Sequence, residues 1–66
     1  MNIATEVKPV SPILGYRMWA QLSDDQPGFA ADVVILEITD QSVLLKDAIG
    51  GGFYRVLRGS VTFYPQ

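Results

Sequence analysis

The chain has 66 residues with seven acidic and five basic side chains, a net charge of −2, and neither cysteine nor histidine. This length allows one small domain, and the missing residue types exclude a disulfide framework, a thiolate zinc site and histidine-based catalysis. The acidic balance argues against a dedicated polyanion-binding protein, which needs a concentrated basic surface.

The small size and the first residues give two general expectations. A domain of this size is marginally stable and usually needs a staple or a partner, so we expect it to oligomerise or to dock on another protein. Residues 1–14 contain neither a basic leader nor an uninterrupted apolar stretch, and no segment is long enough to span a bilayer. We therefore expect a soluble cytoplasmic protein with no membrane partner, or a virion-associated protein if the chain comes from a phage.

Residues 1–13 are predicted to form an extended N-terminal arm, and residues 14–66 are predicted to form the folded domain. Pro9 and Pro12 favour extended backbone for themselves and for their neighbours. The apolar residues of this segment are too many for a solvated tail: Ile3, Val7, Val10 and Ile13. We expect the arm to lie along this domain or along a neighbouring one. The alternative is that it is simply a first edge strand.

Residues 14–22 alternate in the two-residue period of a half-buried strand. The alternation directs five side chains towards the interior: Leu14, Tyr16, Met18, Ala20 and Leu22. It directs Arg17 and Trp19 towards the outside. Residues 23–30 then form a turn, because Pro27-Gly28 fits the central positions of a type II turn.

Residues 31–39 are rich in β-branched side chains, which predicts a second strand that is apolar on both faces. We assign Val34, Leu36 and Ile38 to the interior, and Val33 and Ile35 with Glu37 to the outside. A polar break over residues 40–42 precedes the returning strand, over residues 43–46.

Three glycines over residues 50–52 form a loop before a fourth strand over residues 53–58. Gly59-Ser60 forms a tight turn before a fifth strand over residues 61–64, which Pro65 ends. Five short strands without a convincing helix favour an all-β fold, since closure protects the edges of a small antiparallel sheet. The predicted fold is a small five-stranded antiparallel SH3-like barrel with an extended N-terminal arm.

The chain has more apolar residues than one small interior can hold. The expected interior consists of Tyr16, Met18, Leu22, Val34, Leu36, Ile38, Val43, Leu45, Tyr54, Val56, Val61 and Phe63. The remaining apolar side chains are Trp19, Val33, Ile35, Leu44, Phe53 and Leu57. Together with Arg17 they form the predicted protein interface. Contiguous exposed apolar patches mark association sites. The alternative is that the arm covers this face within the monomer.

The leading functional hypothesis is therefore a non-enzymatic interaction or assembly module, which self-associates as a homo-oligomer or docks on a larger protein. By analogy, such a module suits an accessory protein of a phage or mobile element, for example a capsid decoration protein or an inhibitor of a host system. The carboxylates occupy turns and strand ends, so we predict no catalytic residue, no metal site and no cofactor.

A second hypothesis is a barrel that binds single-stranded nucleic acid. Its site would combine the cations Arg17, Lys46, Arg55 and Arg58 with exposed aromatics such as Tyr54. Few cations on an acidic chain argue against it.

A third hypothesis comes from residues 59–65, Gly-Ser-Val-Thr-Phe-Tyr-Pro. This stretch resembles the closing strand of the plasmid-borne small-barrel dihydrofolate reductases, which reads Gly-Ser-Val-Gln-Ile-Tyr-Pro. The resemblance covers seven residues, and Thr62 replaces the glutamine. It implies an SH3-like barrel that assembles as a tetramer around a pore, where folate and NADPH bind near Val61 and Tyr64.

Overall fold

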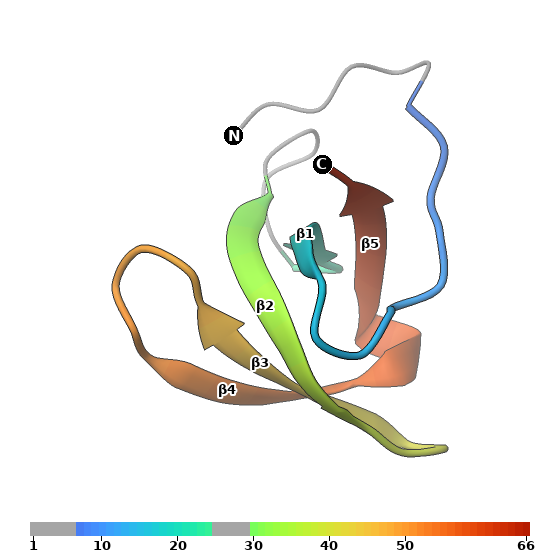
Figure 1. The fold of residues 1–66 in the computed structure, drawn as a ribbon. Coiled ribbons are helices and arrows are strands. Elements are labelled where there is room, and N and C mark those ends of the chain that lie inside the picture. The colour runs from blue at the N-terminus through green and yellow to red at the C-terminus, as the bar shows by residue number, and fades with distance from the viewer. Residues whose placement is uncertain (1–6, 25–29) are drawn as a thin grey trace.

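The computed structural model describes residues 7–24 and 30–66, which form one antiparallel β-sheet. Its elements are β1 (Arg17–Leu22), β2 (Ala31–Ile38), β3 (Ser42–Asp47), β4 (Phe53–Leu57), the short 3₁₀ turn η1 (Arg58–Ser60) and β5 (Val61–Pro65). The strands lie in the order β4-β3-β2-β1-β5, and Figure 1 shows that the sheet curls strongly. The expectation of an all-β fold with five antiparallel strands is confirmed.

The two ends of the sheet do not join. Within the part of the chain that the structure describes, β4 pairs with β3 alone and β5 pairs with β1, so that hydrogen bonds do not close the sheet into a barrel. The sheet therefore has two edges, one on β4 and one on β5. No helix in residues 7–24 and 30–66 is long and apolar enough to cross a bilayer.

The core lies on the concave face of the curled sheet and takes side chains from four strands. Its buried members are Met18, Ala20, Val33, Ile35, Val43, Leu45 and Phe63, with Ile38, Val56 and Val61 packed against them. The interior placement of Met18, Val43, Leu45 and Phe63 is thereby confirmed. The described core cluster contains no polar residue, so it is held by apolar packing.

The predicted faces of β2 are wrong for most of the strand. Val33 and Ile35 are buried in the core, whereas Val34 is half-buried and Leu36 is exposed. The reason is an irregularity in the β2–β3 pairing between Ile35 and Glu37, which inserts one residue as a β-bulge. The insertion shifts the side-chain alternation by one position, so that Val33, Ile35 and Ile38 all reach the same core. A strict two-residue period cannot place them together.

The first strand begins later than predicted. Gly15 adopts a positive φ of 82°, and the N–H of Tyr16 donates to the carbonyl of Ile13 at 3.0 Å, which makes a turn immediately before Arg17. Glycine adopts this left-handed conformation without steric cost. Leu14 and Tyr16 are exposed as a result, and the interior placement of Tyr16 is wrong.

The connections agree in part with the predicted turns. Gly59 and Ser60 lie in η1, and β4 ends at Leu57 rather than at Arg58. The β2–β3 turn is held by Thr39, whose hydroxyl accepts from the N–H of Ser42 at 2.9 Å. The predicted Pro27-Gly28 turn lies outside the described residues.

The described part of the arm, residues 7–13, runs along the outer edge of β5 (Figure 1). Val10 forms an isolated β-bridge with Phe63 and donates its N–H to the Phe63 carbonyl at 2.9 Å. The arm thus lies against its own domain at this point. Residues 1–6, which include Ile3, lie outside the described residues.

Candidate functional site

The candidate site is the free edge of β4, and the hydrogen bonds to β3 determine which backbone groups it exposes. Asp47 donates its N–H to the Gly52 carbonyl at 2.7 Å, and Arg58 donates its N–H to the Gln41 carbonyl at 2.9 Å. Hydrogen-bonded pairs alternate along an antiparallel ladder, so Tyr54 and Val56 bond to β3 between these two pairs. The N–H and C=O groups of Phe53, Arg55 and Leu57 consequently point away from the sheet.

The edge on β5 is protected in two ways. By the same alternation, Val61, Phe63 and Pro65 direct their backbone groups away from β1. The Phe63 carbonyl is bound by Val10 of the arm, and Pro65 has no N–H to donate. The residues of β4 include neither proline nor lysine, two residue types that commonly protect edges. The β4 edge is therefore the less protected of the two.

The side chains of β4 are mostly exposed although three of its five residues are large and apolar. Phe53 is 65% exposed and Leu57 64% on the outer face, and Tyr54 is 48% exposed on the face that carries the core. We call Phe53, Tyr54, Arg55 and Leu57 the edge surface. Aromatic residues and arginine are enriched in protein interfaces, which makes the composition of this surface typical of an association site.

The three cations near the edge surface are engaged with neighbours. Arg55 contacts Glu37 at 3.0 Å and donates to the Ser42 hydroxyl at 3.1 Å. Arg58 donates to the Thr39 carbonyl at 3.2 Å, and the Lys46 ammonium lies 6.0 Å from the centre of the Phe53 ring. These cations are therefore tied to the hairpin rather than gathered into one free basic patch.

The structure places some residues of the predicted interface in the core and others on the outer face. Val33 and Ile35 are buried in the core, so their assignment to an outer face is wrong. The cause is the β2 bulge, which shifts the side-chain alternation within the strand. Trp19 and Leu44 are half-buried on the outer face, where Trp19 pairs with Tyr64 and Asp32 across the neighbouring strands. Phe53 and Leu57 are exposed, as predicted.

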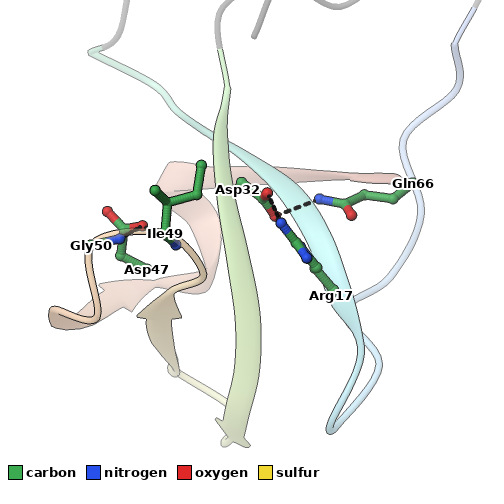
Figure 2. Close-up of polar contacts among 6 residues, drawn as sticks. All are labelled: Arg17, Asp32, Asp47, Ile49, Gly50 and Gln66. Atoms are coloured by element: carbon green, nitrogen blue, oxygen red, sulfur yellow. Dashed lines mark hydrogen bonds and ion pairs between the residues drawn. The ribbon is translucent and has the colours of Figure 1, made fainter.

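Arg17, which was predicted for both the protein interface and the nucleic-acid site, forms an ion pair with Asp32 (Figure 2). Its Nε and Nη2 donate to the two carboxylate oxygens of Asp32 at 2.9 and 2.6 Å, and Gln66 donates to Asp32 Oδ1 at 2.6 Å. The hydrogen bond from Arg17 is the main reason that the pKa of Asp32 lies below its usual value. The guanidinium links β1 to β2.

Asp47 organises the loop between β3 and β4 (Figure 2). Its Oδ1 accepts the N–H groups of Ile49 and Gly50 at 2.8 Å each. These two bonds, led by the one from Gly50, lower the pKa of Asp47. Gly51 has a positive φ of 80°, a conformation that glycine adopts readily, and its N–H donates to the Asp47 carbonyl at 3.0 Å. The carboxylate thus holds the loop that leads into the edge surface.

Two hollows lie beside the strands β1 to β4 and the loop between β3 and β4. An apolar cavity of about 440 Å³ opens between the two halves of the sheet and is lined by Ala20, Leu22, Ala31, Val33, Leu45, Tyr54, Arg55 and Val56. A shallower hollow of about 630 Å³ lies beside Trp19 and Asp32, with Ile49 at its rim. Among residues 7–24 and 30–66, no three acidic side chains gather closely enough to hold a metal ion.

The sequence did not reveal that Ile13, Leu14 and Tyr16 are exposed at the turn before β1, nor that Leu36 is exposed on β2. The signal at the turn was Gly15, a residue type that adopts the positive φ of a turn readily. The residues of the dihydrofolate reductase resemblance lie on η1 and β5, where Phe63 is buried and Val61, Thr62 and Tyr64 are half-buried.

No family model, curated protein or solved structure matches the chain.

Proposed function

We propose that the protein is an assembly module without catalytic activity, which self-associates through the edge surface of β4. The observation that carries this proposal is that β4 combines large exposed apolar side chains with outward backbone groups that no strand in the described part of the chain pairs with. An exposed apolar edge strand pairs readily with another chain. The other form of the same function is docking of this edge on a larger protein.

The size of the domain supports self-association over an independent monomer. Among the described residues the core cluster has seven buried members, of which one is an alanine, and a 66-residue domain commonly gains stability from a partner. Burial of Phe53 and Leu57 would add apolar area to this small total at roughly 25 cal/mol per Å². The edge surface therefore offers the stabilisation that the isolated core does not supply.

We also assign the fold to the SH3-like class. The strand order β4-β3-β2-β1-β5, the 3₁₀ turn before β5 and the longer connection over residues 23–30 support this assignment. The fold class alone does not identify an activity, since small barrels of one topology serve unrelated functions.

The experiment that tests the proposal is the mass in solution, measured by size-exclusion chromatography with light scattering over a wide concentration range. We expect a defined oligomer that dissociates on dilution. Leu57→Ser should shift the equilibrium towards the monomer, whereas the matched control Leu14→Ser should not. Both leucines are exposed to a similar degree, 64% and 61%, but Leu14 lies outside the edge surface. A monomer at every concentration would overturn self-association.

A further inference from the structure

We infer that the β4 edge binds the β4 edge of a second copy in antiparallel orientation, with the twofold axis passing between the two Arg55 residues. This inference rests on the proposed function and specifies its partner and register. It predicts a closed dimer in which one continuous sheet crosses the interface.

The backbone argument comes first. Phe53, Arg55 and Leu57 each direct one donor and one acceptor away from the sheet. These positions are spaced as an antiparallel partner strand requires, because hydrogen-bonded positions recur every second residue. With the axis at Arg55, Phe53 pairs with Leu57 of the second copy, and Arg55 pairs with Arg55 of the second copy. All the outward backbone groups of β4 are then satisfied.

The side chains are complementary in this same register. On the outer face Phe53 lies opposite the second copy's Leu57, and the twofold axis repeats this contact at the other end of the strand. On the core face Tyr54 lies opposite the second copy's Val56. Aromatic and β-branched side chains are favourable cross-strand neighbours, which supports the contact of Tyr54 with Val56. The contact of Phe53 with Leu57 removes apolar area from water. Both contacts bury side chains that the monomer leaves exposed or half-buried.

The pair of Arg55 side chains at the axis is the unfavourable element of this register. Like charges directly opposite each other destabilise a sheet. Here each guanidinium already contacts Glu37 of its own chain at 3.0 Å, so the interface holds two ion pairs rather than two isolated cations. The repulsion is thereby reduced.

The second edge of the sheet explains why the assembly closes. A strand that paired with β5 would displace Val10 from the Phe63 carbonyl and would find no donor at Pro65. Pairing of β4 with β5 of the next copy would produce an open or ring-shaped array, whereas β4 with β4 ends after two copies. The protected β5 edge thus favours the closed dimer.

A disulfide cross-link tests the register, since the natural chain contains no cysteine. Hydrogen-bonded antiparallel pairs have Cα atoms about 5.5 Å apart, which falls in the range that a disulfide spans. Arg55→Cys should therefore form a covalent dimer under mild oxidation. Leu14 is also exposed but lies on the turn before β1, far from Arg55 in the sequence, so Leu14→Cys should remain largely uncross-linked.

Amide hydrogen exchange on the unmodified chain provides a second test, which needs no variant to fold. As the concentration rises, the amides of Phe53, Arg55 and Leu57 should gain protection, whereas those of Tyr54 and Val56 should be protected at all concentrations. An oligomer without this alternation, or without the Arg55→Cys cross-link, would overturn the β4–β4 pairing and would leave standing only that the chain self-associates. A monomer throughout would overturn both.

Discussion

Arg17 binds Asp32 through two hydrogen bonds of 2.9 and 2.6 Å and so joins the outer faces of β1 and β2. The Asp32 side chain is only 9% exposed, whereas that of Arg17 is 57% exposed. The carboxylate is therefore the partner that folding removes from water. An uncompensated Asp32 would be costly, because a carboxylate withdrawn from water needs a partner.

This pair makes the stability of the protein depend on pH at acidic values. The hydrogen bond from Arg17 lowers the pKa of Asp32 below the 3.8 of an unperturbed group. The stabilisation is present above pH 3.8 and is lost as the pH falls through the lower folded-state pKa. Asp32→Asn should be less stable than the natural chain near neutral pH and should lose less stability on acidification. Urea unfolding at several pH values measures this, with the exposed Asp40→Asn as control. An identical pH dependence in both variants would contradict the prediction.

A second prediction concerns the loop between β3 and β4. Asp47→Ala removes the acceptor of the Ile49 and Gly50 amides, whereas Asp47→Asn keeps a side-chain oxygen in the same place. We expect Asp47→Ala to lower the thermal unfolding midpoint more than Asp47→Asn does. Differential scanning calorimetry of the two variants measures the difference. Equal midpoints would show that the loop does not depend on these hydrogen bonds.

The bulge in β2 predicts that two adjacent substitutions differ in their cost to stability. Ile35 is completely buried, and Ile35→Val should cost about 0.5–1.5 kcal/mol of unfolding free energy. Leu36 is the exposed neighbour, and Leu36→Ala should stay within about 0.5 kcal/mol of the natural chain. Chemical denaturation distinguishes the two. A larger loss at Leu36 would mean that the strand presents its other face to the core.

The same bulge shows how far the fold could be predicted from the sequence. The strand positions and their order along the chain follow from β-branched runs and turn residues, and the inward side chains of β1 and β3 follow from alternation. The inward side chains of β2 do not follow, because an irregularity between Ile35 and Glu37 changes the face within the strand. A bulge is a property of two paired strands, and the sequence of one strand does not specify it.

The candidate site was predictable in part of its side chains but not in its backbone. Tyr54 was expected in the interior, and the structure leaves it 48% exposed. Phe53 and Leu57 were expected on the outside because the interior was already full, and the structure exposes both. Whether their strand lies in the middle or at the edge of the sheet depends on the pairing of distant segments. The same limit applies to Val10, whose bond to Phe63 joins residues far apart in the sequence.

The bond of Val10 to Phe63 supports a fourth prediction. Val10→Pro removes the donor, whereas Val10→Ala removes only side-chain atoms. We expect Val10→Pro to be less stable than Val10→Ala by about 0.5–1.5 kcal/mol, the usual net contribution of one hydrogen bond. Urea unfolding of both variants gives the comparison. Equal stabilities would mean that the arm contributes nothing at this position.

The last prediction concerns the charge at the proposed dimer axis. Glu37→Gln removes the carboxylate that contacts Arg55 at 3.0 Å and leaves two guanidinium groups facing each other. Arg55→Thr instead removes the repulsion and introduces a good strand residue. A cross-strand pair contributes about 0.2–1 kcal/mol, which corresponds to a change of up to about fivefold in the dissociation constant.

We therefore expect Glu37→Gln to weaken the dimer and Arg55→Thr to strengthen it. Sedimentation equilibrium measures both constants, with Asp40→Asn as a control that removes a nearby acidic charge without touching Arg55. Added salt should screen the repulsion and bring the Glu37→Gln dimer closer to the natural one. A dimer weakened by Arg55→Thr and unaffected by Glu37→Gln would place Arg55 in an attractive contact, and the twofold axis would then lie elsewhere on β4.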